Sequence, residues 1–187
     1  GSGTVVAVLD TGITPHSDLD TNIVAGYDFI SDAATARDGD GRDPNPNDAG
    51  DWCGWFECPQ IFPSDSSWHG THVAGTIAAV TNNGLGVAGV APSARIVPVR
   101  VLGTCGGYTS DIAAGVVWAS GGTVSGIPAN AYPARVLNLS LGGSGACGTT
   151  MQNAINSARS RSAMLVISAG NSNTNASNAS PANCAGV

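Results

Sequence analysis

The stretch VVAVLD, residues 5–10, consists of five consecutive apolar residues closed by an aspartate. A half-buried strand would alternate apolar and polar residues, whereas a strand that is covered on both faces is apolar throughout. We therefore predict a strand over residues 4–9 that lies inside a parallel sheet, with Asp10 at its carboxyl end.

Further apolar stretches alternate with helical patterns along the rest of the chain. Pro98 lacks a backbone N–H, so the strand that contains it is expected to lie at a sheet edge or to form a bulge. The alternation predicts an α/β fold, a doubly wound, mostly parallel sheet with helices on both faces. We predict strands over residues 95–102, 135–141 and 163–168, and helices after His69 and over residues 110–119 and 149–160.

Residues 31–68 break this alternation and are rich in Asp, Gly, Pro and Trp. A connection of this length without regular structure is uncommon inside a compact domain, and such loops are usually functional or held in place by other groups. Because the chain shows neither an internal repeat nor a second domain pattern, we predict one domain.

The composition excludes two classes of protein. Charged residues make up 11% of the 187 residues, with no lysine and a net charge of −6, whereas about 25% is typical of soluble domains. A nucleic-acid-binding protein would need clustered lysine and arginine. A membrane span would need an apolar run of about 20 residues, and the sequence contains neither feature.

The cysteines indicate where the protein works. They form no CxxC motif and have no neighbouring histidines, which argues against zinc. With the low charge, they favour disulfides in an oxidising compartment, so we predict a secreted, extracellular protein. The odd count leaves one thiol over, or paired with a cysteine outside this chain. The five are Cys53, Cys58, Cys105, Cys147 and Cys184.

Two positions carry side chains suited to acid–base chemistry. A buried carboxylate at Asp10 is costly without a partner, although an aspartate that caps a turn is the simpler interpretation. In SWHGTHVAGT, residues 67–76, His69 begins the predicted helix as either a capping residue or a general base held by a carboxylate. The metalloprotease motif H-E-x-x-H is absent, and we predict His72 to be a buried structural histidine.

Asn171 follows the last predicted strand in the sequence ISAGN. An asparagine after glycine is most often a turn residue. A side-chain amide at the carboxyl end of a strand can also donate a hydrogen bond to an oxyanion. Function gathers at these strand ends in doubly wound sheets, so both interpretations stay open.

Five segments, in order VVAVLDTGI, HGTHVAGT, GVAP, NLSLGG and SAGN, resemble the subtilisin family of serine endopeptidases over essentially the whole chain. HGTHVAGT is the most specific of them. The resemblance implies that Asp10 orients His69, that His69 is the general base, and that Asn171 is the oxyanion donor in peptide-bond hydrolysis.

The family's nucleophile motif, Gly-Thr-Ser, does not occur among these residues. We therefore expect residues 1–187 to be the N-terminal and central part of a single peptidase domain, truncated on its C-terminal side. The nucleophile-bearing segment would lie outside this chain. Without a nucleophile no acyl-enzyme forms, so the chain alone is expected to be inactive.

The resemblance also implies a substrate groove, in which a protein or peptide substrate lies as an added β-strand. Because none of its S1 residues is acidic, we predict a preference for uncharged, apolar P1 side chains over Arg or Lys. One side of the groove would be formed by Gly106, Gly107 and Tyr108. The S1 pocket would be formed by Ser140, Leu141, Gly142, Ala169, Gly170 and Ala179.

Calcium is the cofactor suggested by the acidic part of the long loop, where carboxylates alternate with glycines. Calcium prefers six to eight oxygen ligands, and a solvated acidic turn is the alternative. The resemblance supports calcium, since several secreted relatives carry a calcium-binding insertion here, and it implies a second site at Asp18 and Asn83. The candidate ligands of the first site are Asp38, Asp40, Arg42, Asp43 and Asp51.

The resemblance further implies two disulfides, Cys58–Cys105 and Cys147–Cys184, similar to bridges in secreted relatives. This leaves the state of Cys53 open.

Two other interpretations remain at this point. A catalytically inactive protein that keeps the subtilisin fold for binding predicts decay of the catalytic positions, yet Asp10, His69 and Asn171 are all present. An unrelated doubly wound ligand-binding protein lacks support, because no GxGxxG motif follows a strand. Beyond the substrate, the expected partners are the rest of the same domain and a propeptide or protease inhibitor.

Overall fold

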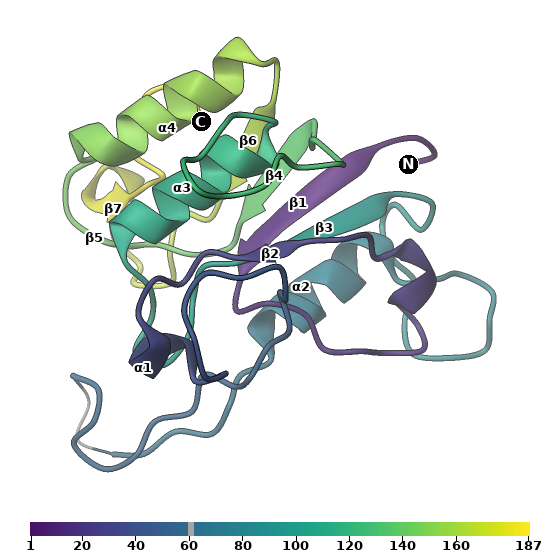
Figure 1. Cartoon of the computed structure of the whole chain (residues 1–187), viewed down its shortest axis with the longest axis horizontal. Helices are drawn as coiled ribbons and strands as arrows, with labels where there is room; N and C mark the ends of the chain where they lie inside the picture. The colour runs from purple at the N-terminus through teal and green to yellow at the C-terminus, as the bar shows by residue number, and fades with distance from the viewer. Residues whose placement is uncertain (60–61) are drawn as a thin grey trace.

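The computed structural model describes residues 1–59 and 62–187. In that part of the chain, five parallel strands form one sheet in the order β2-β3-β1-β4-β6 (Figure 1). The strands are β1 (Val5–Asp10), β2 (Tyr27–Asp28), β3 (Arg95–Arg100), β4 (Val136–Leu139) and β6 (Met164–Ile167).

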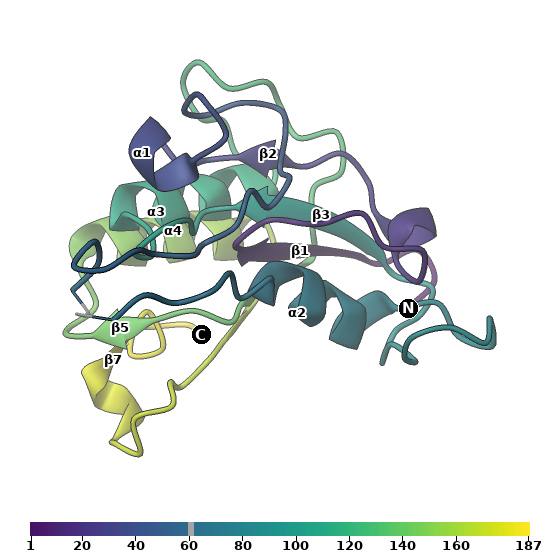
Figure 2. The ribbon, with the colours of Figure 1, turned by 90° about the horizontal axis from the view of Figure 1, so that it is seen from below.

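Helices cover both faces of the sheet. Helix α2 (His69–Ala78) lies on one face, and α3 (Thr109–Ala119) and α4 (Thr149–Ser160) lie side by side on the other (Figure 2). The predicted doubly wound α/β fold is therefore confirmed. The smaller elements are α1 (Ala33–Ala36), the 3-10 helices Asp20–Asn22 and Ala176–Asn178, and the antiparallel pair β5 (Gly143–Ser144) and β7 (Ala179–Ser180).

The core consists of two apolar layers separated by the sheet. On β1, Ala7 and Leu9 pack into the layer under α3 and α4, whereas Val6 and Val8 pack into the layer under α2. Alternate side chains of a strand point to opposite faces, so both faces of β1 are buried, which is the reason that its sequence does not alternate. No helix of the described residues is long and apolar enough to cross a membrane.

The position of β3 in the sheet differs from the one expected for a strand that contains a proline. Strand β3 lies between β2 and β1, and its register with β1 runs without interruption from Arg95 to Arg100. The prediction of a sheet edge at Pro98 was therefore wrong, and no bulge interrupts its pairing with β1. The proline is accommodated on the β2 side, where pairing is interrupted between the Ile23–Ile96 bridge and the Tyr27–Val99 pair, with three residues on one side opposite two on the other. Gly26 lies against Pro98 so closely that a Cβ would be 1.9 Å from the proline carbonyl oxygen.

The long loop is ordered in part by a buried ion network. Arg100 is fully buried at the end of β3; its Nη1 donates to Asp28 at 2.6 Å and to Asp38 at 2.5 Å, and its Nη2 donates to the carbonyl oxygen of Ala36. Burial raises the pKa of Asp28 to about 7, and the hydrogen bond from Ile30 N–H and the charge of Arg100 oppose that rise. A single guanidinium at the end of β3 thus joins β2 and the acidic loop.

Candidate active site

Asp10 and His69 meet at the carboxyl edge of the sheet. Asp10 ends β1 with no exposed surface, and His69 is the first residue of α2. The Nδ1 atom of His69 lies 2.8 Å from Oδ1 and 2.9 Å from Oδ2 of Asp10. Burial raises the pKa of Asp10, while the hydrogen bonds from His69 and from Thr11 N–H act in the opposite direction. The imidazole is held on one side and is 46% exposed, so a reactant can reach it.

Small residues and a hydroxyl bring the helix against this strand end. A Cβ at Gly70 would lie 2.3 Å from the carbonyl oxygen of Gly12, so no larger residue allows this approach. Thr11 N–H donates to Asp10 Oδ1 at 2.8 Å, and Thr11 Oγ1 accepts from Gly70 N–H at 3.0 Å. Thr11 therefore contacts both the aspartate and the start of the histidine's helix.

The segment before α2 is fixed by Asp51. Its carboxylate accepts from the N–H of Ser67 at 2.6 Å and from the hydroxyl of Ser67 at 2.7 Å, and Ser67 Oγ accepts from His69 N–H at 3.3 Å. Asp51, a candidate calcium ligand, is thus hydrogen-bonded to Ser67, which lies two residues before the proposed base.

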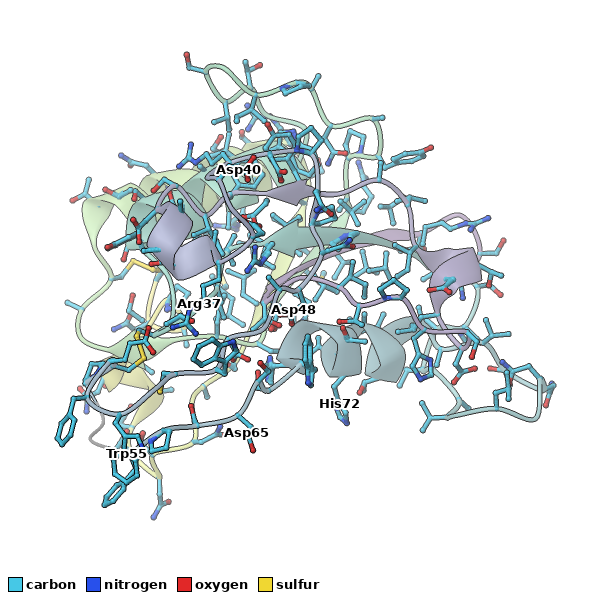
Figure 3. All side chains as sticks on the ribbon, turned by 60° about the horizontal axis from the view of Figure 1, so that its bottom comes forward. Arg37, Asp40, Asp48, Trp55, Asp65 and His72 are labelled. Carbon is cyan, nitrogen blue, oxygen red and sulfur yellow. A yellow bond between two sulfur atoms is a disulfide. The ribbon has the colours of Figure 1, made fainter. Side chains whose placement is uncertain are left out.

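His72 is exposed on the side of α2 that faces away from the sheet (Figure 3). The prediction of a buried structural histidine was wrong. The buried residues of this helix are instead Gly70, Ala74, Gly75 and Ala78, of which Ala74 and Ala78 belong to the apolar layer between α2 and the sheet.

The predicted S1 residues line one hollow of about 430 Å³ at the ends of β4 and β6. Asn171 lines the same hollow, so the structure brings it together with the S1 residues. All described residues that line the hollow are uncharged. The lining includes Ser140, Leu141, Gly142, Ala169, Gly170 and Ala179.

A second hollow, of about 600 Å³, shares residues 140–144 with the first and continues to Gly106 and Gly107. Tyr108 follows these glycines as the N-cap of α3 and is 56% exposed. The two hollows together form a groove bounded by the two predicted substrate-binding segments.

Both implied cysteine pairs are disulfides in the structure. Cys58–Cys105 ties the long loop to the turn before Gly106, and Cys147–Cys184 ties the start of α4 to the segment after β7. Cys53 is buried, and its Sγ lies 3.3 Å from Ser64 Oγ.

In the acidic loop, the side chains of three candidate calcium-binding residues already have partners within the protein. Asp38 is paired with Arg100, Arg42 is paired with Asp111 at 2.6 Å, and Asp43 accepts from Asn45 N–H at 2.9 Å. Asp40 is exposed. Among residues 1–59 and 62–187, no three His, Cys, Asp or Glu side chains converge as metal ligands.

The second candidate calcium site, at Asp18 and Asn83, is more compact. Asp18 Oδ1 accepts from the amide of Asn83 at 2.6 Å, and Oδ2 accepts from Val87 N–H at 2.9 Å, which together lower the pKa of Asp18. Gly86 lies directly over this carboxylate, since a Cβ there would be 2.2 Å from Oδ2. The loop thus wraps a charged carboxylate and a side-chain amide, two groups that supply oxygen ligands for calcium.

Sequence reasoning missed Thr11 and Asp48 as parts of this site. Thr11 Oγ1 donates to Asp48 Oδ2 at 2.6 Å across 37 positions of sequence. The position of Thr11, directly after Asp10, is the one sequence signal that could have drawn attention to it.

Comparison with known proteins gives one family. The model of the subtilase family matches residues 1–187. An extracellular protease of Xanthomonas campestris is 68% identical over this whole chain, and an extracellular basic protease of Dichelobacter nodosus is 54% identical over it. The chain spans 32% of the length of each of these curated relatives. A solved protease structure from Pseudoalteromonas arctica superposes with a TM-score of 0.98 at 63% identity, covering 100% of this chain and 55% of that one.

Proposed function

The chain belongs to the subtilase family, and we propose on that premise that it supplies the aspartate and histidine of a secreted serine endopeptidase. The observation that carries the proposal is the Asp10–His69 pair, in which a buried carboxylate holds one ring nitrogen of an exposed histidine. A histidine held in this way has one fixed tautomer and a second nitrogen available for proton transfer.

In this mechanism His69 takes the proton of a serine hydroxyl as the serine attacks the scissile carbonyl, and then gives that proton to the leaving amine. Asp10 keeps the imidazole oriented and stabilises its charged form. Asn171 donates its side-chain amide to the oxyanion that develops on the carbonyl oxygen. The uncharged lining of the S1 hollow supports a preference for apolar P1 side chains.

We propose that the nucleophile-bearing segment follows this chain and completes the domain. Met164 and Val166 of the terminal strand β6 are 65% and 48% exposed, and as alternate residues of one strand they lie on the same face of the sheet. Apolar side chains grouped on one face indicate a contact surface, and the remainder of the same domain is the partner we assign to it. "Extended protein" below means this chain joined to that segment.

Secretion is proposed from two observations. The two curated relatives above are both named as extracellular, and the chain contains two disulfides. Disulfides of this kind form and persist outside the cytosol.

The test of the function is covalent labelling of the extended protein with a fluorophosphonate, combined with hydrolysis of two peptides that differ only in Leu or Arg at P1. We expect one label per molecule and a higher kcat/KM for the Leu peptide. Intact, correctly folded protein that neither labels nor cleaves would contradict the endopeptidase and support the inactive binding protein. Preference for the Arg peptide would contradict the proposed S1 specificity alone.

Calcium binding remains a proposal for Asp18 and Asn83, whose side-chain oxygens would hold the ion together with loop carbonyl groups. Calcium would then stabilise the fold, by about 2.7 kcal/mol at one hundred times its dissociation constant. We expect calcium to raise the Tm of fluorophosphonate-blocked extended protein above its Tm in chelator, and Asp18→Asn to abolish this difference. The assignment of calcium to Asp18 would be contradicted if Asp43→Asn abolished the calcium-dependent difference in Tm and Asp18→Asn preserved it.

A further inference from the structure

The long loop reaches the proposed catalytic pair through Asp48. The carboxylate of this residue is partly buried and accepts from the hydroxyl of Thr11 through Oδ2 and from Gly50 N–H, at 2.8 Å, through Oδ1. Its backbone N–H donates to the carbonyl oxygen of Ile13 at 2.9 Å. Both the side chain and the backbone of Asp48 are therefore fixed against the turn that follows β1, and Figure 3 shows Asp48 near the start of α2.

The long loop and the turn after β1 are in close backbone contact. Gly12 has a φ of +108°, and a Cβ there would lie 2.6 Å from the carbonyl oxygen of Pro46 and 3.0 Å from Asp48 N. The backbone of Pro46 also accepts from Ile13 N–H at 3.0 Å. The contact of Asp48 with Thr11 is thus one part of a close backbone interface.

Thr11 has three hydrogen bonds with a definite direction. Its N–H donates to Asp10 Oδ1, its Oγ1 accepts from Gly70 N–H, and its hydroxyl proton goes to Asp48. A hydroxyl has one proton and two acceptor positions. Because the carboxylate of Asp48 accepts only, it fixes the hydroxyl proton on its own side and leaves a lone pair toward Gly70, the residue next to His69.

We propose that Asp48 is a positioning residue for the catalytic pair: through Thr11 it locks the start of α2, and with it His69, against Asp10. The proposal rests on the proposed endopeptidase function. It assigns the long loop a role in the reaction that is exerted from outside the substrate groove, since Asp48 lines neither of the two hollows that form the groove.

The experiment compares four variants of the extended protein with wild type, each with active sites counted by fluorophosphonate titration. Asp48→Ala and Thr11→Val remove the hydrogen bond, whereas Asp48→Asn and Thr11→Ser keep an acceptor and a hydroxyl, respectively. We expect the first two to lower kcat per titrated site by about 10- to 100-fold, since small misplacements of reacting groups cost this much. KM should change little, and the conservative pair should restore most of the rate.

Asp65→Asn is the matched control, because Asp65 is an exposed aspartate of the same loop (Figure 3). It should behave as wild type. Asp48→Ala with wild-type kcat per titrated site would overturn the inference while leaving the endopeptidase intact. The inference would also be overturned if Asp48→Ala changed only the Tm or the number of titratable sites.

A second readout does not depend on turnover. A proton on Nδ1 of His69 that is hydrogen-bonded to Asp10 gives a far-downfield resonance in the proton NMR spectrum. We expect Asp48→Ala to shift or broaden that resonance and Asp65→Asn to leave it unchanged. If wild-type protein proves inactive, the proposed function fails, and an unchanged resonance in Asp48→Ala would independently overturn the positioning role.

Discussion

Replacing His69 with alanine is expected to reduce kcat of the extended protein by about 100- to 10,000-fold, the range that a positioned general base contributes. The physical reason is that, among the described residues, this ring is the one side chain that contacts the fully buried carboxylate of Asp10, so no other described side chain is placed to take the proton from the attacking serine. Because the change leaves the buried carboxylate of Asp10 without its ring partner, it should also lower the Tm, by an amount that corresponds to about 1–3 kcal/mol. Steady-state kinetics with the Leu peptide, on protein checked by thermal unfolding, measures both quantities.

The control for this prediction is His72→Ala. His72 lies three residues further along the same helix and is exposed on the side away from the sheet, so its loss should change neither kcat nor Tm appreciably. If His69→Ala turned over at the wild-type rate, the Asp10–His69 pair would be a structural contact, and the assignment of the general base would be wrong.

The sequence pattern correctly predicted strands and helices in which each buried face carries residues of one kind. A strand such as β1, buried on both faces, has no polar position to obscure its pattern, and the helix that begins at His69 has small residues at the spacing that faces the sheet. Strand β2 was missed because its two residues, Tyr27 and Asp28, are too few to show a period. The sheet edge expected at Pro98 was wrong because the residue that accommodates the proline across the sheet, Gly26, is 72 positions away in the chain.

The acidic loop shows that sequence spacing has the same limitation when it is used to predict a binding site. A run of aspartates and glycines has the same appearance whether its carboxylates face a cation from solvent or an arginine of the protein. Here Asp38 meets Arg100 across 62 positions, and Asp48 meets Thr11 across 37. Such pairings are decided by the tertiary fold, so sequence spacing could suggest calcium but could not identify the partners that the carboxylates have.

Replacing Arg100 with methionine is expected to lower the free energy of unfolding by about 3–5 kcal/mol, the cost of breaking a buried ion pair by removing one partner. Both Arg100 and Asp28 are fully buried, and the guanidinium also holds Asp38 and the carbonyl oxygen of Ala36. The measurement is denaturant unfolding of fluorophosphonate-blocked extended protein. Arg95→Met is the control, because Arg95 is an exposed arginine at the other end of β3 and should cost less than about 0.5 kcal/mol.

The pH dependence of stability separates this network from a simple packing defect. In the folded wild type the pKa of Asp28 is raised to about 7 from an ordinary value of 3.8. Between these two values the folded state binds more protons than the unfolded state, so the contribution of Asp28 to the free energy of unfolding falls as the pH rises and is constant above about 7. Without Arg100 only the hydrogen bond from Ile30 N–H offsets the buried charge, so in Arg100→Met the decline should continue to higher pH, whereas Asp28→Asn should remove it. An Arg100→Met variant whose loss of stability is the same at every pH would show that the guanidinium fills space and does not neutralise the two carboxylates.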